Sequence, residues 1–150
     1  MEDAYIVDAV RTPFGKHDGL FRDTHPQDLA VKPLLALEER NGFTGAEDIE
    51  DVVYGCVSPL DEQGMNIGRI ATMVAGWDDS VPGVQINRAC GSGQQEVNFA
   101  GAQVGSGLQD MLIGGGIEHM TRVPILSDTP TSENEINRKT LTDTYFEHYD

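Results

Sequence analysis

The stretch that most constrains the fold is Gly83–Gly93, because it reads as a short β-strand, a glycine-flanked bend and the start of a helix. Val84–Asn87 combines β-branched residues with alternating polarity, as a strand does. Ser92 and Gln95 have capping-box spacing, which predicts a helix that begins beside Cys90. A strand, a tight turn and a helix in this order are typical of α/β proteins.

The residues after this bend predict a buried helix, since Val97, Ala100, Val104 and Leu108 recur at helical intervals. Cys90 would then lie at a helix N-terminus, where free N–H groups and the positive end of the helix dipole favour a thiolate. The same donors can hold a developing oxyanion. We therefore interpret Cys90 as a candidate nucleophile. The alternative is a buried structural thiol at a tight turn.

Strand and helix patterns alternate along the rest of the chain. Further strands are predicted at Tyr5–Val10, Ile49–Val57 and Asp110–Gly116, and a helix at 66–75. Such alternation predicts a mostly parallel sheet with helices on both faces. Active sites in these sheets lie beyond the carboxyl ends of the strands, and Cys90 falls there.

The first helix has its own start and stop signals. Thr24 and Gln27 have capping-box spacing with Pro26 inside the first turn, and the helix should stop at Asn41-Gly42. Pro33 lacks a backbone donor, so a kink or a restart is expected there.

The remaining titratable side chains give weaker signals. Cys56 ends the second strand, and we interpret it as a small core residue. We interpret all four histidines as solvated loop residues rather than catalytic bases: His17, His25, His119 and His148. Two cysteines without a spacing pattern indicate neither a disulfide framework nor a metal site, so no metal ligand is predicted and a reducing compartment fits. Because no leader or membrane span is evident either, we expect a cytoplasmic protein.

Charge restricts the partners. The 25 acidic and 10 basic residues give a formal net charge of -15, which argues against binding to nucleic-acid phosphates. The acidic residues are spread along the chain, as in proteins from a high-salt cytoplasm, where a carboxylate-rich surface keeps proteins soluble. The alternative is an ordinary acidic mesophilic enzyme.

Four segments in order carry a resemblance to a known family. Asn87–Gly93 closely resembles the nucleophile segment of the thiolases, the acyl-CoA C-acetyltransferases. Three further segments are similar to the first strand, the second-helix entry and the Gly-Gly-x-Glu-Ser-Met segment of that family: Tyr5–Lys16, Gln63–Arg69 and Gly115–Met120. Two departures are His119, where serine is usual, and Pro33 in the first helix.

The resemblance implies a thiolase-like α/β fold. Residues 1–121 would form the N-terminal half without its last strand, and residues 122–150 would begin the loop domain that helps enclose coenzyme A. Cys90 would attack the keto carbonyl of a 3-ketoacyl-CoA, retain the acyl group as a thioester and pass it to a second coenzyme A. Coenzyme A would thus be a substrate, with no cofactor bound permanently and with substrate-binding residues unassigned.

In this family a histidine, a second cysteine and an Asn-Glu motif complete the site from a second half that these 150 residues do not contain. We therefore expect the 150-residue chain alone to be inactive and poorly stable, and the full enzyme to be a homodimer or homotetramer. Two alternatives stay open. One is a ketoacyl-synthase-type condensing enzyme that acts on carrier-protein thioesters, and the other is a non-catalytic subunit that binds acyl-CoA or a partner chain.

Overall fold

The computed structural model describes residues 2–125 and 127–128. Its elements along the chain are α1 (Pro26–Asn41), α2 (Gly45–Asp48), β1 (Asp51–Gly55), a 3-10 helix (Asp61–Gln63), α3 (Ile67–Val74), β2 (Val84–Ile86), α4 (Ser92–Gly105) and β3 (Leu112–Gly116). The predicted loop domain at 122–150 and His148 fall largely or wholly outside the described residues, so both stay predictions. None of the helices in the described part of the chain is both long and apolar enough to span a membrane.

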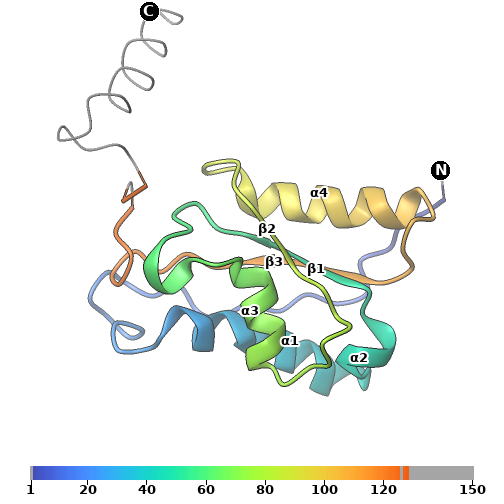
Figure 1. The fold of residues 1–150 in the computed structure, drawn as a ribbon, viewed down its shortest axis with the longest axis horizontal. Helices are drawn as coiled ribbons and strands as arrows, with labels where there is room; N and C mark the ends of the chain where they lie inside the picture. Colours follow the sequence, from blue (N-terminus) through green and yellow to red (C-terminus); the bar gives the residue numbers. More distant parts are fainter. Residues whose placement is uncertain (1, 126, 129–150) are drawn as a thin grey trace, which may run out of the picture.

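The three strands form one parallel sheet in the order β2-β1-β3. Val53 of β1 is paired with Val84 of β2 on one side and with Gly114 of β3 on the other. Helices α1 and α3 lie on one face of this sheet, and α4 covers the opposite face (Figure 1). The predicted parallel sheet with helices on both faces is therefore confirmed.

The hydrophobic core lies between β1 and the α1–α3 pair. Leu34, Val52 and Ile67 are completely buried there. Each such aliphatic side chain stabilises the fold by about 1.5–3 kcal/mol relative to an exposed position. The hydroxyl of Tyr54 donates a hydrogen bond of 2.9 Å to the carbonyl of Ala30, which joins β1 to α1. Cys56 is also buried in this cluster, as expected for a small core residue.

The prediction of a first strand at Tyr5–Val10 is wrong for the described residues. The segment is extended, but it pairs with no strand, and Tyr5, Ile6 and Val7 are each about 80% exposed. A β-strand needs a neighbouring ladder for its N–H and C=O groups, and alternating apolar residues cannot provide one by themselves. The segment is held instead through Asp8, whose carboxylate accepts hydrogen bonds from Arg40 and Asn41 at the end of α1.

The first helix differs from its predicted cap. Its N-cap is His25 rather than Thr24, and the imidazole Nδ1 accepts the amide of Gln27 at 3.2 Å. The helix runs through Pro33 without a restart. Its neighbour Leu34 is completely buried, and this packing offsets the one missing backbone bond. Gly42, with a φ of 68°, ends the helix in the left-handed region, at the predicted place.

Helix α4 begins where expected, but not with a capping box. Its N-cap is Gly91, and Ser92 is the first helical residue. The predicted apolar face is not buried either, since Val97 is 41% and Leu108 is 71% exposed. The sheet covers only the side of α4 that carries Ser92 and Glu96, and no described element covers the other side.

Candidate active site

The turn between β2 and α4 is fixed by side-chain hydrogen bonds from both of its ends. The Asn87 carboxamide accepts the amide of Ala89 at 2.8 Å and donates to the carbonyl of Val57 at 2.8 Å. The Ser92 hydroxyl accepts the amide of Arg88 at 2.9 Å and donates to the carbonyl of Ala89 at 2.7 Å. The backbone that leads into Cys90 is therefore tied both to the loop after β1 and to the first turn of α4.

Ala89 has a φ of 45°, in the left-handed region. This conformation costs an L-residue about 1–2 kcal/mol, and such residues gather at functional sites because the surrounding structure compensates for them. The next residue, Cys90, is exposed and carries a free thiol. The strained turn thus leaves the sulfur at the surface of the described part of the chain.

The Cys90 thiol lies beside the start of a 14-residue helix, as the sequence predicted. Within the described residues, the amides of Gly93 and Gln94 have no hydrogen-bond partner. Free donors of this kind, with the positive end of the helix dipole, favour an anion at the N-terminus. The arrangement suits a thiolate or a developing oxyanion.

Cys90 borders a cavity of about 490 Å³. Its walls come from the loop 11–22, from Gly55 and Gly116 at the carboxyl ends of β1 and β3, and from the segment 117–121. Ligands of parallel α/β sheets bind at this end of the strands. Among the residues that the structure describes, no cluster of three His, Cys, Asp or Glu side chains suits a metal ion.

Glu118, which follows β3, is bonded to the loop after β1 at the wall of this cavity. Its carboxylate accepts hydrogen bonds from the amide of Val57 at 2.7 Å, the amide of Ser58 at 3.2 Å and the side chain of Gln63 at 3.2 Å. Sequence analysis placed Glu118 in a family-like segment but gave it no role. Its partners lie 55 to 61 residues away, so no local pattern reveals them.

Glu96 is a second buried acid at the cavity, and sequence analysis missed it. It is 4% exposed, and its Oε2 atom has no hydrogen-bond partner in the described part of the chain. Burial raises the pKa of this carboxyl to about 7, against an opposing contribution from the backbone of Gly55. The available signal was its spacing, because Glu96 follows Ser92 by four residues and so shares its face of the helix.

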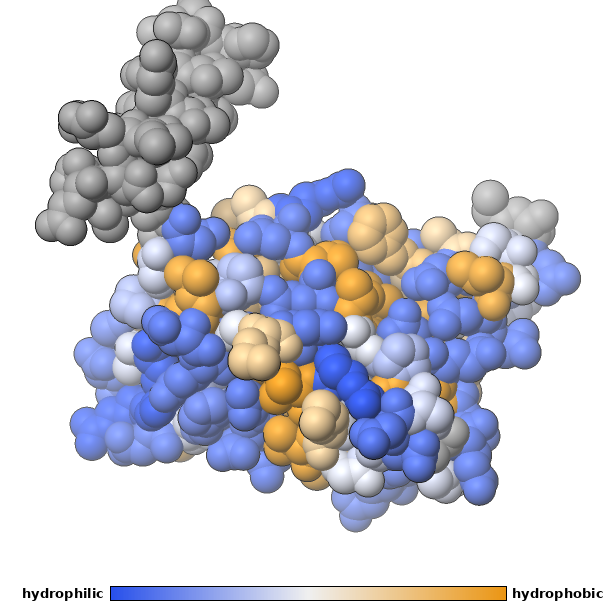
Figure 2. Space-filling view, viewed as in Figure 1, coloured by the Kyte–Doolittle hydropathy of each residue, from blue (hydrophilic) through white to orange (hydrophobic). Residues whose placement is uncertain are grey.

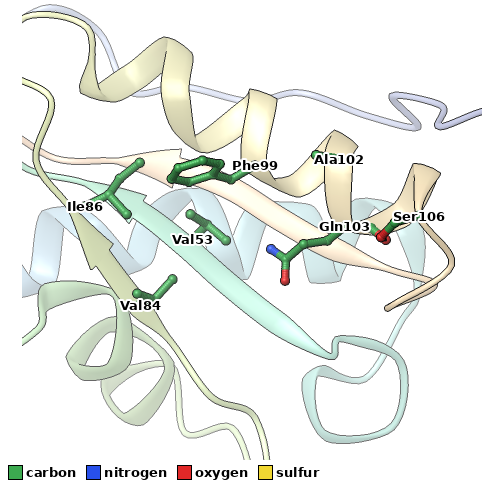
Figure 3. A pocket seen from close by; sticks show the side chains of 7 residues that line it. All are labelled: Val53, Val84, Ile86, Phe99, Ala102, Gln103 and Ser106. Atoms are coloured by element: carbon green, nitrogen blue, oxygen red, sulfur yellow. The ribbon is translucent and has the colours of Figure 1, made fainter. Parts of the chain in front are cut away.

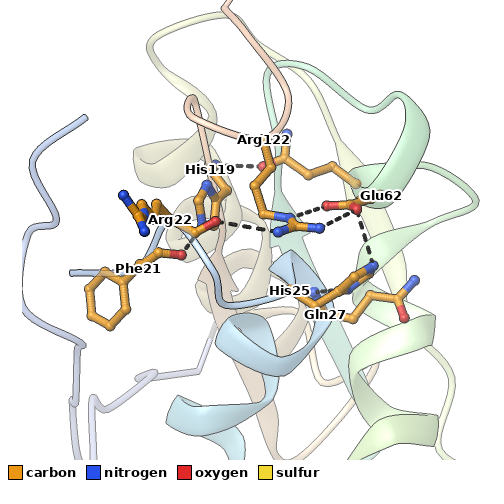
Figure 4. Close-up of polar contacts among 8 residues, drawn as sticks. Phe21, Arg22, His25, Gln27, Glu62, His119 and Arg122 are labelled. Atoms are coloured by element: carbon orange, nitrogen blue, oxygen red, sulfur yellow. Dashed lines mark hydrogen bonds and ion pairs between the residues drawn. The ribbon is translucent and has the colours of Figure 1, made fainter. Parts of the chain in front are cut away.

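Two histidines were wrongly interpreted as solvated. His119 is 5% exposed, and its Nε2 atom lies 2.8 Å from the carbonyl of Phe21. His25 caps α1 and lies 3.8 Å from Glu62, which also pairs with Arg122 (Figure 4). The hydrogen-bonded guanidinium of Arg122 lowers the pKa of Glu62. These contacts fasten the segment after β3 to the loop before α1. They are structural, and neither imidazole bonds to Cys90.

The interpretation of His17 as a solvated residue is confirmed, since its side chain is exposed at the surface.

A separate groove of about 390 Å³ runs between β2 and α4. Val53, Val84, Ile86, Phe99 and Ala102 line it, with the polar ends of Gln103 and Ser106 at one side (Figure 3). Neither cysteine lines this groove, so the Cys90 cavity is the better candidate for thiol chemistry.

Comparisons with known proteins agree with this geometry. Residues 4–149 match the family model described as "Thiolase, N-terminal domain". A β-ketoadipyl-CoA thiolase from Escherichia coli is 42% identical over 132 residues, which are 88% of this chain and 33% of that protein. A steroid 3-ketoacyl-CoA thiolase from Mycobacterium tuberculosis is 38% identical over 133 residues, 89% of this chain and 32% of that protein.

A solved structure gives the same result at the level of the fold. The crystal structure of the Bacillus anthracis acetyl-CoA acetyltransferase superposes with a TM-score of 0.69 at 32% sequence identity. The match covers 75% of this chain and 28% of that one. The chain therefore spans about a third of the length of the relatives it matches.

Proposed function

Because the chain belongs to the thiolase family over residues 4–149, we propose that it is the N-terminal part of an acyl-CoA acyltransferase in which Cys90 carries the acyl group. The observation that supports this most is the exposed Cys90 thiol, held by a strained turn at the N-terminus of α4 and open to a cavity of about 490 Å³. Acyl-CoA thioesters are the proposed substrates, and coenzyme A is a substrate rather than a bound cofactor.

The proposed reaction has two steps. The Cys90 thiolate attacks the keto carbonyl of a 3-ketoacyl-CoA, the bond between C2 and C3 breaks, and the acetyl-CoA carbanion leaves and takes up a proton. The acyl group remains on the sulfur as a thioester. The thiol of a second coenzyme A then attacks this thioester, and Cys90 is released. In both steps the free N–H groups at the start of α4 stabilise negative charge near the sulfur.

The remaining catalytic groups are proposed to come from the two thirds of the relatives' length that this chain does not span. We expect no turnover from the 150 residues alone. The proposed division is an α/β half at 1–121 and the start of a loop domain at 122–150. A homodimer or homotetramer is proposed because α4 and β2 expose apolar side chains such as Phe99 and Val84. A cytoplasmic location is proposed because both cysteines are free thiols.

The test is coenzyme-A-dependent cleavage of acetoacetyl-CoA by the natural polypeptide that carries this sequence. We expect Cys90→Ser to lower kcat by about 1000-fold or more, because an unactivated hydroxyl is a far weaker nucleophile than a thiolate. Cys56→Ala is the matched control and should retain most of the activity. The Cys56 thiol is buried, and its pKa is raised to about 12, so it does not supply a thiolate.

Undiminished turnover of the Cys90→Ser variant would contradict the proposal. A protein that accepts acyl groups from a carrier-protein thioester but not from coenzyme A would instead be the ketoacyl-synthase-type alternative.

A further inference from the structure

Glu96 is a buried acid that borders the same cavity as the proposed nucleophile. Helix α4 packs against β1 and β3, and Glu96 lies on the side of α4 that faces these strands. Its residue is 4% exposed, and its Oε2 atom has no partner among the described residues. An ionised carboxylate is costly in such a place, even with the favourable contribution of the Gly55 backbone, whereas a protonated carboxyl is tolerated.

Two glycines leave the space that this carboxyl fills. A Cβ atom on Gly55, at the end of β1, would overlap the Oε2 atom of Glu96. A Cβ atom on Gly116, at the end of β3, would lie 3.1 Å from both carboxyl oxygens. Both strands thus end in a residue without a side chain where the Glu96 carboxyl lies.

Glu96 and Cys90 border the same cavity. The helix rises by about 6 Å between Ser92 and Glu96, and Cys90 lies two residues before Ser92. The two groups therefore belong to the first turns of α4 and the residues just before it, so a negative charge on Glu96 adds to the electrostatic potential at the sulfur.

Titratable side chains from the segments after β1 and β3 also border this cavity. The Glu118 carboxylate accepts hydrogen bonds from the amides of Val57 and Ser58. The Nε2 atom of His119 lies 2.8 Å from the carbonyl of Phe21. The segment after β1 contributes Cys56, a buried thiol. Tyr54 of β1 does not line the cavity, because its hydroxyl donates to the carbonyl of Ala30 on the other face of the sheet.

The loop 11–22 contributes basic side chains to the lining of the cavity, which are Arg11, Lys16, His17 and Arg22. The guanidinium of Arg11 stacks on Phe14 at 3.6 Å, and Arg88 on the Cys90 turn is bonded to Gln95. None of these cations forms an ion pair with Glu96. Within the described residues, Glu96 therefore has no neutralising partner.

We propose that Glu96 is a positioning residue for the nucleophile: its carboxyl is protonated when Cys90 is reactive, and its ionisation places a negative charge beside the shared cavity that opposes thiolate formation. This inference rests on the proposed role of Cys90. The Glu96 proton is exchanged with solvent through the cavity, and Glu96 forms no bond to the substrate. The pH range in which the site works then depends on two groups, the Cys90 thiol and the Glu96 carboxyl.

The test is the rate at which iodoacetamide alkylates Cys90 between about pH 5.5 and pH 9.5, since only the thiolate reacts. The natural polypeptide is used, and alkylation is followed on the Cys90 peptide by mass spectrometry. Glu96→Gln keeps the shape of the side chain but cannot ionise. We expect its alkylation midpoint to fall by about half a pH unit or more relative to the wild type. Glu39→Gln removes an equal charge from the exposed face of α1 and should leave the midpoint unchanged.

Equal midpoints for the wild type and Glu96→Gln would overturn the inference. If Glu96→Gln does not fold, as judged by circular dichroism, Glu96→Ala removes the same charge without a buried amide and decides the question. Acylation of Cys90 by acetoacetyl-CoA is measured on the wild type in parallel. A wild type that acylates normally but shows no shift in either variant would refute the role of Glu96 and leave the proposed function standing. A wild type that does not acylate would refute the function itself.

Discussion

Glu96 sets a pH dependence for the fold as well as for the site. Its carboxyl is buried without a hydrogen-bond partner for Oε2 in the described part of the chain, and its pKa is raised from an ordinary 4.5 to about 7. The folded state therefore holds this proton more tightly than the unfolded state does. The stability that the protonated form provides is complete below pH 4.5 and is lost as the pH rises through 7.

Replacing Glu96 by Gln should accordingly stabilise the protein at pH 8 but not at pH 4. We expect a gain of about 1–3 kcal/mol in the free energy of unfolding at pH 8, because the variant no longer ionises a buried group. Urea unfolding of both proteins at the two pH values measures the gain. An equal effect at both pH values would show that packing, and not ionisation, distinguishes the two side chains.

Cys90 and Glu96 differ in whether their roles could be predicted from the sequence. Cys90 could be found because glycines, a strand pattern and a helix start surround it within ten residues. The burial of Glu96 could not, because it depends on Gly55 and Gly116, which approach it only through the sheet. The same holds for His119, whose partner Phe21 is 98 residues away.

At the scale of the elements, the turn between β2 and α4 does the most for the site. Asn87 accepts the amide of Ala89 and donates to the carbonyl of Val57, so one side chain fixes the turn and docks it on the loop after β1. Because Ala89 has a φ of 45°, the turn needs such bonds to persist.

Asn87→Ala should therefore loosen the turn, with a loss of about 1–2 kcal/mol in the free energy of unfolding and a lower rate of Cys90 alkylation at pH 8. Asn87→Asp is the matched variant, since it keeps the acceptor for Ala89 and loses the donor to Val57. We expect an intermediate effect. If Asn87→Ala alkylates like the wild type, the turn does not depend on this side chain.

Most elements followed from local patterns, and the failures have a common cause. The strands β1, β2 and β3 and the helices α1, α3 and α4 all lie within their predicted segments. Tyr5–Val10 has as good a strand pattern as Asp51–Gly55, yet only the latter has neighbours with which to pair. A strand depends on what lies beside it, and a sequence pattern gives only its faces. The prediction of a buried apolar face on α4 was wrong for the same reason.

At the scale of the whole molecule, the net charge of -15 dominates. Apolar residues reach the surface in separate patches between hydrophilic ones on the visible face (Figure 2). The negatively charged carboxylates repel one another in the folded state, and salt screens this repulsion.

We therefore expect the urea midpoint of the natural polypeptide to rise when KCl is increased from about 0.1 M to about 1 M. The corresponding gain in the free energy of unfolding should be about 1 kcal/mol or more. An equal osmolality of sucrose is the control for effects other than screening. A midpoint that falls or stays constant in KCl would argue for an ordinary acidic protein rather than one adapted to high salt.

The proposed function requires that Cys90 carries the acyl group. The measurement that tests it most directly is peptide mass spectrometry of the natural polypeptide after brief exposure to acetoacetyl-CoA without free coenzyme A. We expect a gain of about 42 Da, one acetyl group, on the Cys90 peptide, and we expect this gain to disappear when coenzyme A is added. An unmodified Cys90 peptide, or an acetyl group on another residue that coenzyme A removes, would contradict it.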